Sequence, residues 1–438
     1  MSVSGFPEGV SADENVREVA EPAAAPWPFP KRFALCAAFI FFVLVNWPFP
    51  FYLIPYAGRF VTAPVDRMWQ AVVPAVATAL FHVSADGKPN GSGDTTWNYV
   101  QLAIWLICAV MFGAVWAALM RRRAQNERTY EIFRIFLRYA LAASMVSYGV
   151  LKVIQLQFPR PWLERLVQPF GTSSPMGILW TFMGVSRAYN FLTGAAETLA
   201  GVLLTTRRTT FLGGLLAIAV VGNIVALNFC YDVPVKLYSS ELLMMAIIIV
   251  MPDGRGLFDF FLRRRQQPLF SRAALETASL VVRTLLVAAF LLMSFYEAGV
   301  SRRTYGELAP RSPLRGIWNV DVLTDNGAPR PPLQTDVQRW RRVVFDHPVY
   351  NSILLMNDLR QRYTVALDEK KKTVTWTGRD DPKRKFTLAY TRPDPNTLVL
   401  DGMVAGRTLH AICHRAPPTS ELLLTRGFHW INESPFNR

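Results

Sequence analysis

Seven apolar runs, each nearly free of charged residues, are spaced along the first 300 residues of the chain. A helix needs about 20 apolar residues to cross the hydrocarbon core of a bilayer. The pattern therefore predicts an α-helical transmembrane bundle of about seven spans. The expected spans are residues 33–53, 99–120, 132–155, 188–205, 210–229, 238–251 and 279–296.

From residue 301 onward the pattern changes to short stretches in which apolar and polar residues alternate. Such alternation between turn residues indicates antiparallel strands with one buried face. We count about nine strands, from "GIWNVDV" to "ELLLTRG", which suits a small closed β-barrel. The opening Gly316-x-Trp318 and the late Arg426 resemble the calycin (lipocalin-like) arrangement, in which an Arg stacks on a Trp at the barrel floor.

Basic clusters beside the spans predict the orientation, because Lys and Arg near span ends stay in the cytoplasm. They fall in alternate loops, at Lys31 and Arg32, at 121–123 with Arg128, at Arg207 and Arg208, and at Arg255 with 263–265. We expect a multi-span protein of the cytoplasmic (inner) membrane with a disordered cytoplasmic tail (1–30), a bundle (31–300) and an extracytoplasmic β domain (301–438).

Composition and charge limit the partners and cofactors that we expect. The chain has a net charge of +15, and residues 302–438 carry 22 Lys or Arg against 14 Asp or Glu, a net of +8. A basic domain at a membrane is attracted to lipid head groups, although its charges could equally be solvated turns; no nucleic-acid partner is expected. Four cysteines form no C-x-x-C, and no histidine pair lies in the bundle. We therefore expect no metal site, haem or thiol relay.

Two charged residues lie within or near the predicted spans. Lys152 follows Ser144 and Tyr148 at intervals of four, so the three share one helical face. Its ammonium could snorkel to the head groups or point inward. Glu197 lies mid-span, where an isolated charge costs about 3 kcal/mol or more, among small residues that favour close helix packing. It is either a protonated, hydrogen-bonded acid or part of a polar site.

A further set of polar residues surrounds Pro234 in "NFCYDVPVKLYS". Either Asp232 and Lys236 form a structural clasp between two spans, or the polar groups of three spans converge on an outward-facing cavity. On the cavity reading, the candidate ligand-binding residues are Tyr148, Lys152, Glu197, Asn228, Asp232 and Lys236. No set of catalytic residues emerges.

Three of these stretches carry a family resemblance: "YGVLKVIQLQF", "GAAETLAGVLLTTRRTTFLGG" and "LNFCYDVPVKLYS". They resemble the DoxX family of bacterial membrane proteins, whose core is a four-helix bundle with Tyr-Gly-x-x-Lys and Gly-x-x-Glu elements. The resemblance covers about residues 130–265. Because the family is named for subunits associated with a thiosulfate:quinone oxidoreductase, it implies quinone as a possible ligand or cofactor.

The leading hypothesis is an accessory or binding component that holds a small amphipathic ligand, quinone or lipid, in an outward-facing polar cavity. One alternative is the membrane subunit of a quinone-linked oxidoreductase, which would depend on a redox partner protein because the chain has no evident cofactor motif of its own. Another is an envelope scaffold that acts through its β domain.

The sequence also predicts how two further segments are arranged. The proline-interrupted stretch 158–184 should not span, and its first part, around Trp162, should form a short helix on the outer membrane interface. The terminal "RGFHWINESPFNR" should be docked, because exposed aromatic residues at a chain end invite association. It either plugs the β domain or supplies His429, Trp430 and Glu433 to a pocket.

Overall fold

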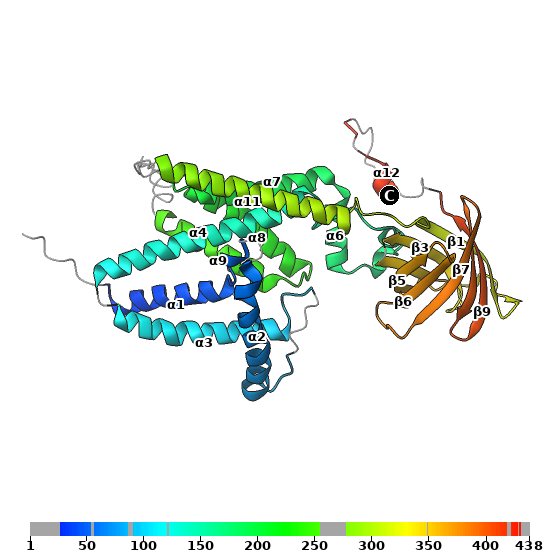
Figure 1. Cartoon of the computed structure of the whole chain (residues 1–438), viewed down its shortest axis with the longest axis horizontal. Coiled ribbons are helices and arrows are strands. Elements are labelled where there is room, and N and C mark those ends of the chain that lie inside the picture. The colour runs from blue at the N-terminus through cyan, green and yellow to red at the C-terminus, as the bar shows by residue number, and fades with distance from the viewer. Residues whose placement is uncertain are drawn as a thin grey trace, which may run out of the picture.

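A computed structural model of the chain describes residues 27–53, 57–85, 91–120, 122–254, 277–347, 349–417, 422–427 and 429–430. A helical bundle comes first and a β-barrel follows it (Figure 1). Nearly all of the predicted tail 1–30 lies outside the described residues.

Every predicted apolar run coincides with a helix. The long helices are α1 (Phe29–Val45), α2 (Ala57–Val76), α3 (Thr96–Leu119), α4 (Arg123–Val153), α7 (Arg187–Thr205), α8 (Thr210–Cys230), α9 (Lys236–Val250) and α11 (Thr277–Thr304). Within the described residues, three helical segments are long and apolar enough to cross a membrane: Thr96–Leu119, Thr210–Cys230 and Val281–Thr304. By this measure the molecule is a membrane protein, with three such segments rather than the predicted seven.

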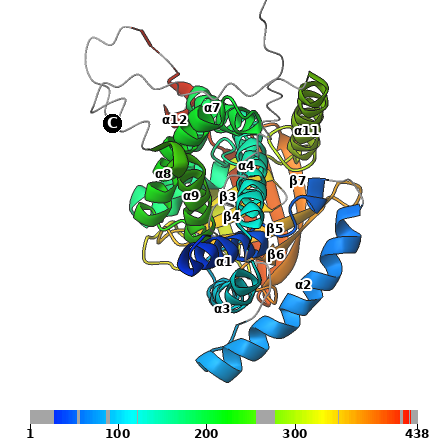
Figure 2. The same ribbon diagram turned by 90° about the vertical axis from the view of Figure 1, so that its left-hand side faces the viewer.

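The first run was predicted too long. Helix α1 ends at Val45, before the sequence "NWPFPF", because Pro48 and Pro50 cannot continue a helix. The next helix, α2, was not predicted, since Pro64 and Pro74 lie inside it and charged residues interrupt its apolar positions. It packs on α3 and runs across the direction of the other helices (Figures 1 and 2).

Four helices form a closed ring at the centre of the bundle. Helix α4 packs against α7, α7 against α8, α8 against α9, and α9 against α4 (Figure 2). Glycines allow the closest approach, because a Cβ on Gly194 would lie 2.6 Å from the carbonyl oxygen of Gly149 on the facing helix. Helices α1 and α3 pack as a pair beside α4, and α11 lies against α4 and α7.

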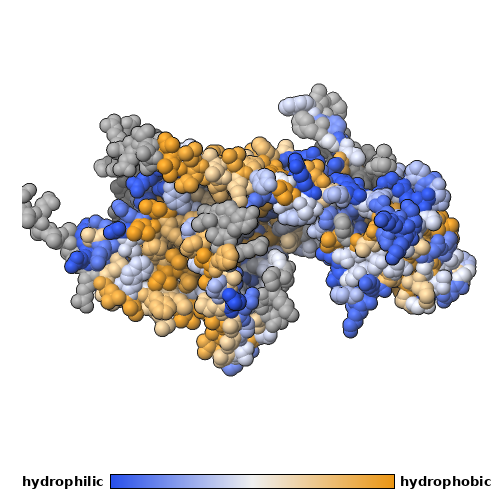
Figure 3. All heavy atoms as spheres, in the orientation of Figure 1, coloured by the Kyte–Doolittle hydropathy of each residue, from blue (hydrophilic) through white to orange (hydrophobic). Residues whose placement is uncertain are grey.

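The surface of the bundle is banded. Apolar side chains cover its flanks, whereas polar residues gather at the end away from the barrel and over the barrel itself (Figure 3). Helices α1 and α4 begin at that far end, and α7 and α9 end beside the first half of α4 (Figure 1). Two contacts fix this arrangement: Arg134 lies 3.7 Å from Asp253, and Arg138 donates to the Thr205 carbonyl at 3.3 Å.

Short elements lie between the longer helices of the bundle. They include α5 (Leu163–Leu166), α6 (Pro175–Val185) and the single turns Phe51–Leu53, Ala77–Phe81, Phe170–Thr172 and Met251–Asp253. As expected, the stretch 158–184 contains no helix that meets the length for spanning, and α6 is a short apolar helix.

The β domain is a closed antiparallel barrel. Its strands are β1 (Gly316–Asp325), β2 (Ala328–Pro329), β3 (Trp340–His347), β4 (Tyr350–Leu355), β5 (Arg360–Asp368), β6 (Thr373–Gly378), β7 (Lys385–Asp394), β8 (Thr397–Val404) and β9 (Arg407–Arg415). Neighbours pair in the order β1-β3-β4-β5-β6-β7-β8-β9, and β9 pairs with β1 to close eight strands, while β2 adds to the edge of β1. The ninth predicted strand, "ELLLTRG", was wrong: its run of adjacent leucines lacks alternation and forms the short helix α12 (Leu422–Thr425).

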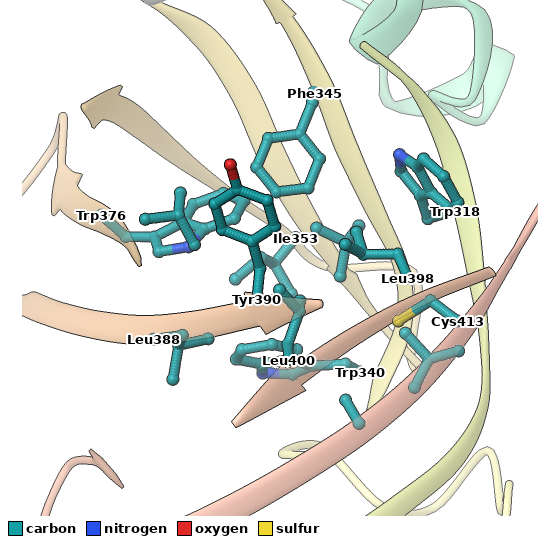
Figure 4. Packing of buried hydrophobic residues seen from close by; sticks show 14 of the residues in the cluster. Trp318, Trp340, Phe345, Ile353, Trp376, Leu388, Tyr390, Leu398, Leu400 and Cys413 are labelled. Atoms are coloured by element: carbon teal, nitrogen blue, oxygen red, sulfur yellow. The ribbon is translucent and has the colours of Figure 1, made fainter. Parts of the chain in front are cut away.

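Aromatic side chains fill the barrel. Trp318 and Trp376 are fully buried, and Trp340 and Tyr390 point into the same core (Figure 4). Trp318 does lie against arginine side chains, and two of them come from the barrel strands themselves. The guanidinium groups of Arg392 and Arg415 each lie 5.7 Å from the centre of the ring. An arginine on β9, paired directly opposite Trp318, reaches the ring more easily than one beyond the barrel.

One arginine of the β domain is buried and donates its hydrogen bonds to backbone carbonyl groups. Arg339 is 1% exposed, and its guanidinium donates to the carbonyl oxygens of Arg330 at 2.8 Å, Trp340 at 2.9 Å and Asp321 at 3.1 Å. Burying a charge is costly unless its donors are satisfied. This side chain therefore ties together three backbone segments.

Helix α5 joins the bundle to the barrel. Trp162, just before it, stacks on Tyr350 with ring centres 4.8 Å apart, and the backbone N–H of Leu163 donates to Asp346 at 2.7 Å. Leu163 packs on Ile317 and Val344 of the barrel. The prediction that this face lies on the membrane was wrong, because the barrel buries the same apolar residues.

Candidate functional site

A cavity of about 550 Å³ lies inside the four-helix ring. Its walls come from α4, α6, α7, α8 and α9 and are mostly apolar. The apolar lining includes Met145, Phe158, Leu179, Trp180, Met183, Leu192, Ile224, Leu227 and Leu242. The residues from α6 were missed by sequence reasoning. The only signal for them was an apolar run of 11 residues, too short to read as a span.

A buried ion pair forms the polar part of the wall. Lys152 of α4 is 5% exposed and Glu197 of α7 is 1% exposed, and the ammonium of Lys152 contacts Oε1 of Glu197. The ammonium therefore does not snorkel to the membrane surface. Gly149 and Gly194 allow α4 and α7 to approach closely beside the ion pair, so that the side chains of Lys152 and Glu197 can meet. The other carboxylate oxygen, Oε2, has no hydrogen-bond partner among the described residues.

Hydroxyl and amide groups line the cavity beside the pair. Tyr238 donates its hydroxyl to Ser144 at 3.0 Å, and the Asn228 amide donates to Ser239 at 2.9 Å. Tyr148 also lines the cavity and lies against Tyr238, with ring centres 6.0 Å apart. The structure thus brings four of the six candidate residues, Tyr148, Lys152, Glu197 and Asn228, to one cavity.

The remaining two candidates form a clasp outside the cavity lining. The Lys236 ammonium lies 2.9 Å from Asp232 and 3.8 Å from Asp94. Asp94 also accepts the backbone N–H groups of Lys236 at 2.8 Å and Leu237 at 3.0 Å. The structure therefore does not bring Asp232 and Lys236 to the cavity lining, and the alternative, a clasp between neighbouring segments, describes their contacts.

Asp94 was missed because its partner lies far away in sequence. Helix α9 begins without a capping side chain of its own, and Asp94, from the polar stretch "GSGDTTW" before α3, satisfies its first N–H groups instead. A negative charge at a helix N-terminus is favourable. Local sequence around α9 contains no hint of this cap.

The second predicted pocket involved the chain end. His429 and Trp430 are exposed, Trp430 by 91%, so the expectation that this Trp is buried by docking was wrong. Glu433 lies outside the described residues. A pocket that includes these three residues stays a prediction.

The bundle cavity combines mostly apolar walls with a few polar side chains, namely the ion pair and the neighbouring hydroxyl and amide groups. Ligand sites of this kind are mostly apolar with a few placed polar groups. Among the described residues, no group of three or more His, Cys, Asp or Glu is placed to hold a metal ion.

These features define the class of protein: a membrane-helix bundle with an internal cavity, joined to a closed β-barrel. A protein of Bacillus subtilis (strain 168), "Uncharacterized protein YwoB", is 33% identical to the chain over 157 residues, which cover 94% of that protein and 35% of this chain. The chain therefore belongs to the same family as YwoB. No family model and no solved structure matches it.

Proposed function

We propose that the protein is an inner-membrane binding component that holds a small amphipathic molecule, a quinone or a lipid, in the bundle cavity. In this proposal the ring of α4, α7, α8 and α9 is the DoxX-like core. The segments that cross the membrane in this proposal are Thr96–Leu119, Thr210–Cys230 and Val281–Thr304, and the barrel lies on the extracytoplasmic side.

The observation that carries the proposal is the half-satisfied ion pair in an apolar cavity. A buried acceptor without a partner costs about 1–3 kcal/mol, and the second oxygen of Glu197 is such an acceptor among the described residues. A hydroxyl or N–H of a ligand head group would satisfy it, and the remaining N–H groups of Lys152 could donate to a carbonyl or phosphate oxygen. The apolar walls would then take the hydrocarbon part.

The proposed orientation rests on the ends of the helices. Arg32 lies in the first turn of α1, Arg122 and Arg123 lie at the start of α4, and Arg207 follows the end of α7. Helices α1 and α4 begin at the end of the bundle away from the barrel (Figure 1). Because basic residues near span ends are retained in the cytoplasm, this distribution supports a barrel on the outer side. In this arrangement α2, which runs across the other helices, would lie along the outer membrane surface with exposed apolar residues such as Phe60 and Met68 in lipid.

The test is mass spectrometry of molecules that purified protein retains after gentle extraction. Ala196→Phe should fill part of the cavity and lower the amount of retained molecule, since Ala196 lines it. Glu197→Gln should weaken retention while leaving the cavity open. Leu199→Phe is the matched control, because Leu199 lies on the same helix but is 52% exposed on its outer face. Equal retention in all four proteins, or none in the wild type, would refute the proposal.

A further inference from the structure

A second and larger hollow, of about 750 Å³, lies where the bundle meets the barrel. It is separate from the bundle cavity, although Phe158 lines one and the next residue, Pro159, lines the other. Its walls come from the segment before α5, the chain after α11, the start of β1 and the end of β9. We refer to it as the junction cleft.

Both acidic groups of the junction cleft are already neutralised. Asp346 pairs with Arg315 at 2.8 Å. Glu307 pairs with Arg187 at 2.5 Å and with Arg302 at 3.2 Å. Neither carboxylate is therefore left to balance further positive charge.

Three more arginines line the same cleft. In the described part of the chain, their hydrogen-bond acceptors are backbone carbonyls: Leu424 for Arg160 at 3.1 Å, Glu307 for Arg311 at 3.1 Å, and Arg315 for Arg415 at 2.7 Å. Carbonyl oxygens are neutral, so within the described residues no carboxylate forms an ion pair with any of these three arginines. Each guanidinium has five N–H donors, so each keeps donors for a ligand.

We propose that the junction cleft binds a phosphate group. Guanidinium groups recognise phosphate oxygens through paired, charge-assisted hydrogen bonds. A phosphate offers several oxygens around one atom and can accept from more than one arginine, whereas a carboxylate offers two. Like charges gathered in a cleft also raise the local concentration of anions. The phosphate belongs either to a lipid head group at the membrane surface or to a small soluble anion.

The experiment measures binding to the full-length protein in neutral detergent by calorimetry, with inorganic phosphate, short-chain phosphatidylglycerol and short-chain phosphatidylcholine as probes. The test variant is Arg160→Gln with Arg311→Gln. The charge-matched control is Lys370→Gln with Lys371→Gln, in an exposed turn of the barrel. Arg160→Lys with Arg311→Lys keeps the charge but loses the paired donors, and provides a folded variant if the glutamines disturb the junction.

We expect the double glutamine variant to bind phosphate about tenfold more weakly than wild type, because it loses charge-assisted hydrogen bonds. The affinity of the double lysine variant should lie between those of wild type and the glutamine variant. The Lys370 and Lys371 control should bind as tightly as wild type. Binding of inorganic phosphate identifies a small-anion site, and binding of phosphatidylglycerol alone identifies a head-group site. If no probe binds, if wild type and the Arg160 and Arg311 variants bind equally, or if the control loses as much affinity, the proposal is overturned.

Discussion

The ion pair between Lys152 and Glu197 should be the strongest single polar coupling in the bundle. Replacing Lys152 by Met removes the cation and leaves the carboxyl group of Glu197, which is 1% exposed, in an apolar wall. Breaking a buried pair by removing one partner costs about 3–5 kcal/mol, because the other group loses its compensation. We therefore expect Lys152→Met to lower the free energy of unfolding by about 3 kcal/mol.

Replacing both members should recover much of that loss. In Lys152→Met with Glu197→Gln no charge remains buried, and apolar or neutral replacements of a buried pair are often nearly neutral. The double variant should thus lie within about 1–2 kcal/mol of wild type, which gives a coupling energy of about 2 kcal/mol or more in a double-mutant cycle. Unfolding is followed in mixed micelles with increasing denaturing detergent, by helical circular dichroism.

The clasp supplies a matched control. Lys236 and Asp232 also form a Lys–carboxylate pair, but the Asp232 side chain is 85% exposed. Exposed pairs are screened by water and contribute little to stability, so the cycle on Lys236→Met and Asp232→Asn should give a small coupling. Additive effects at Lys152 and Glu197, or equal couplings for the two pairs, would refute the assignment of a buried ion pair.

Three further predictions concern packing, the barrel and pH. Gly149→Ala should lower the melting temperature, since the new Cβ would lie 2.6 Å from the backbone nitrogen of Thr198, whereas Gly222→Ala, with no atom within 4 Å, should be neutral or stabilising by up to about 1 kcal/mol. Arg339→Met should destabilise the barrel by about 3 kcal/mol in urea, read from tryptophan fluorescence, because three carbonyls lose their donor; an unchanged midpoint would contradict this. Burial lowers the pKa of His347, against the opposing effect of Asp346, so barrel stability should be full above pH of about 6.5 and decrease as the pH falls below it. His347→Gln should flatten that decrease, and an identical pH profile would count against it.

The sequence predicts those parts of the molecule that a local pattern determines. Uncharged runs become helices, and period-two alternation becomes the eight strands of the barrel. Glu197 was singled out because a carboxyl group within a span needs a partner. Its partner Lys152 is the lysine of the Tyr-Gly-x-x-Lys stretch. The structure brings Glu197 of α7 and Lys152 of α4 into contact.

The errors come from contacts between distant segments. Asp94 caps α9 from a segment more than 140 residues earlier in the chain, and no local signal records that. The face of Trp162 is apolar whether it meets lipid or the barrel, so the pattern could not choose between them. Arg415 reaches Trp318 through strand register, which emerges only when the barrel closes.

We propose above that the cavity beside Lys152 and Glu197 holds an amphipathic molecule. An experimental structure of the protein, purified from native membranes without added ligand, tests it most directly. We expect an elongated density within the four-helix ring, with its polar end in contact with the Lys152–Glu197 pair. A cavity that contains only water, or one closed by its own side chains, would contradict it.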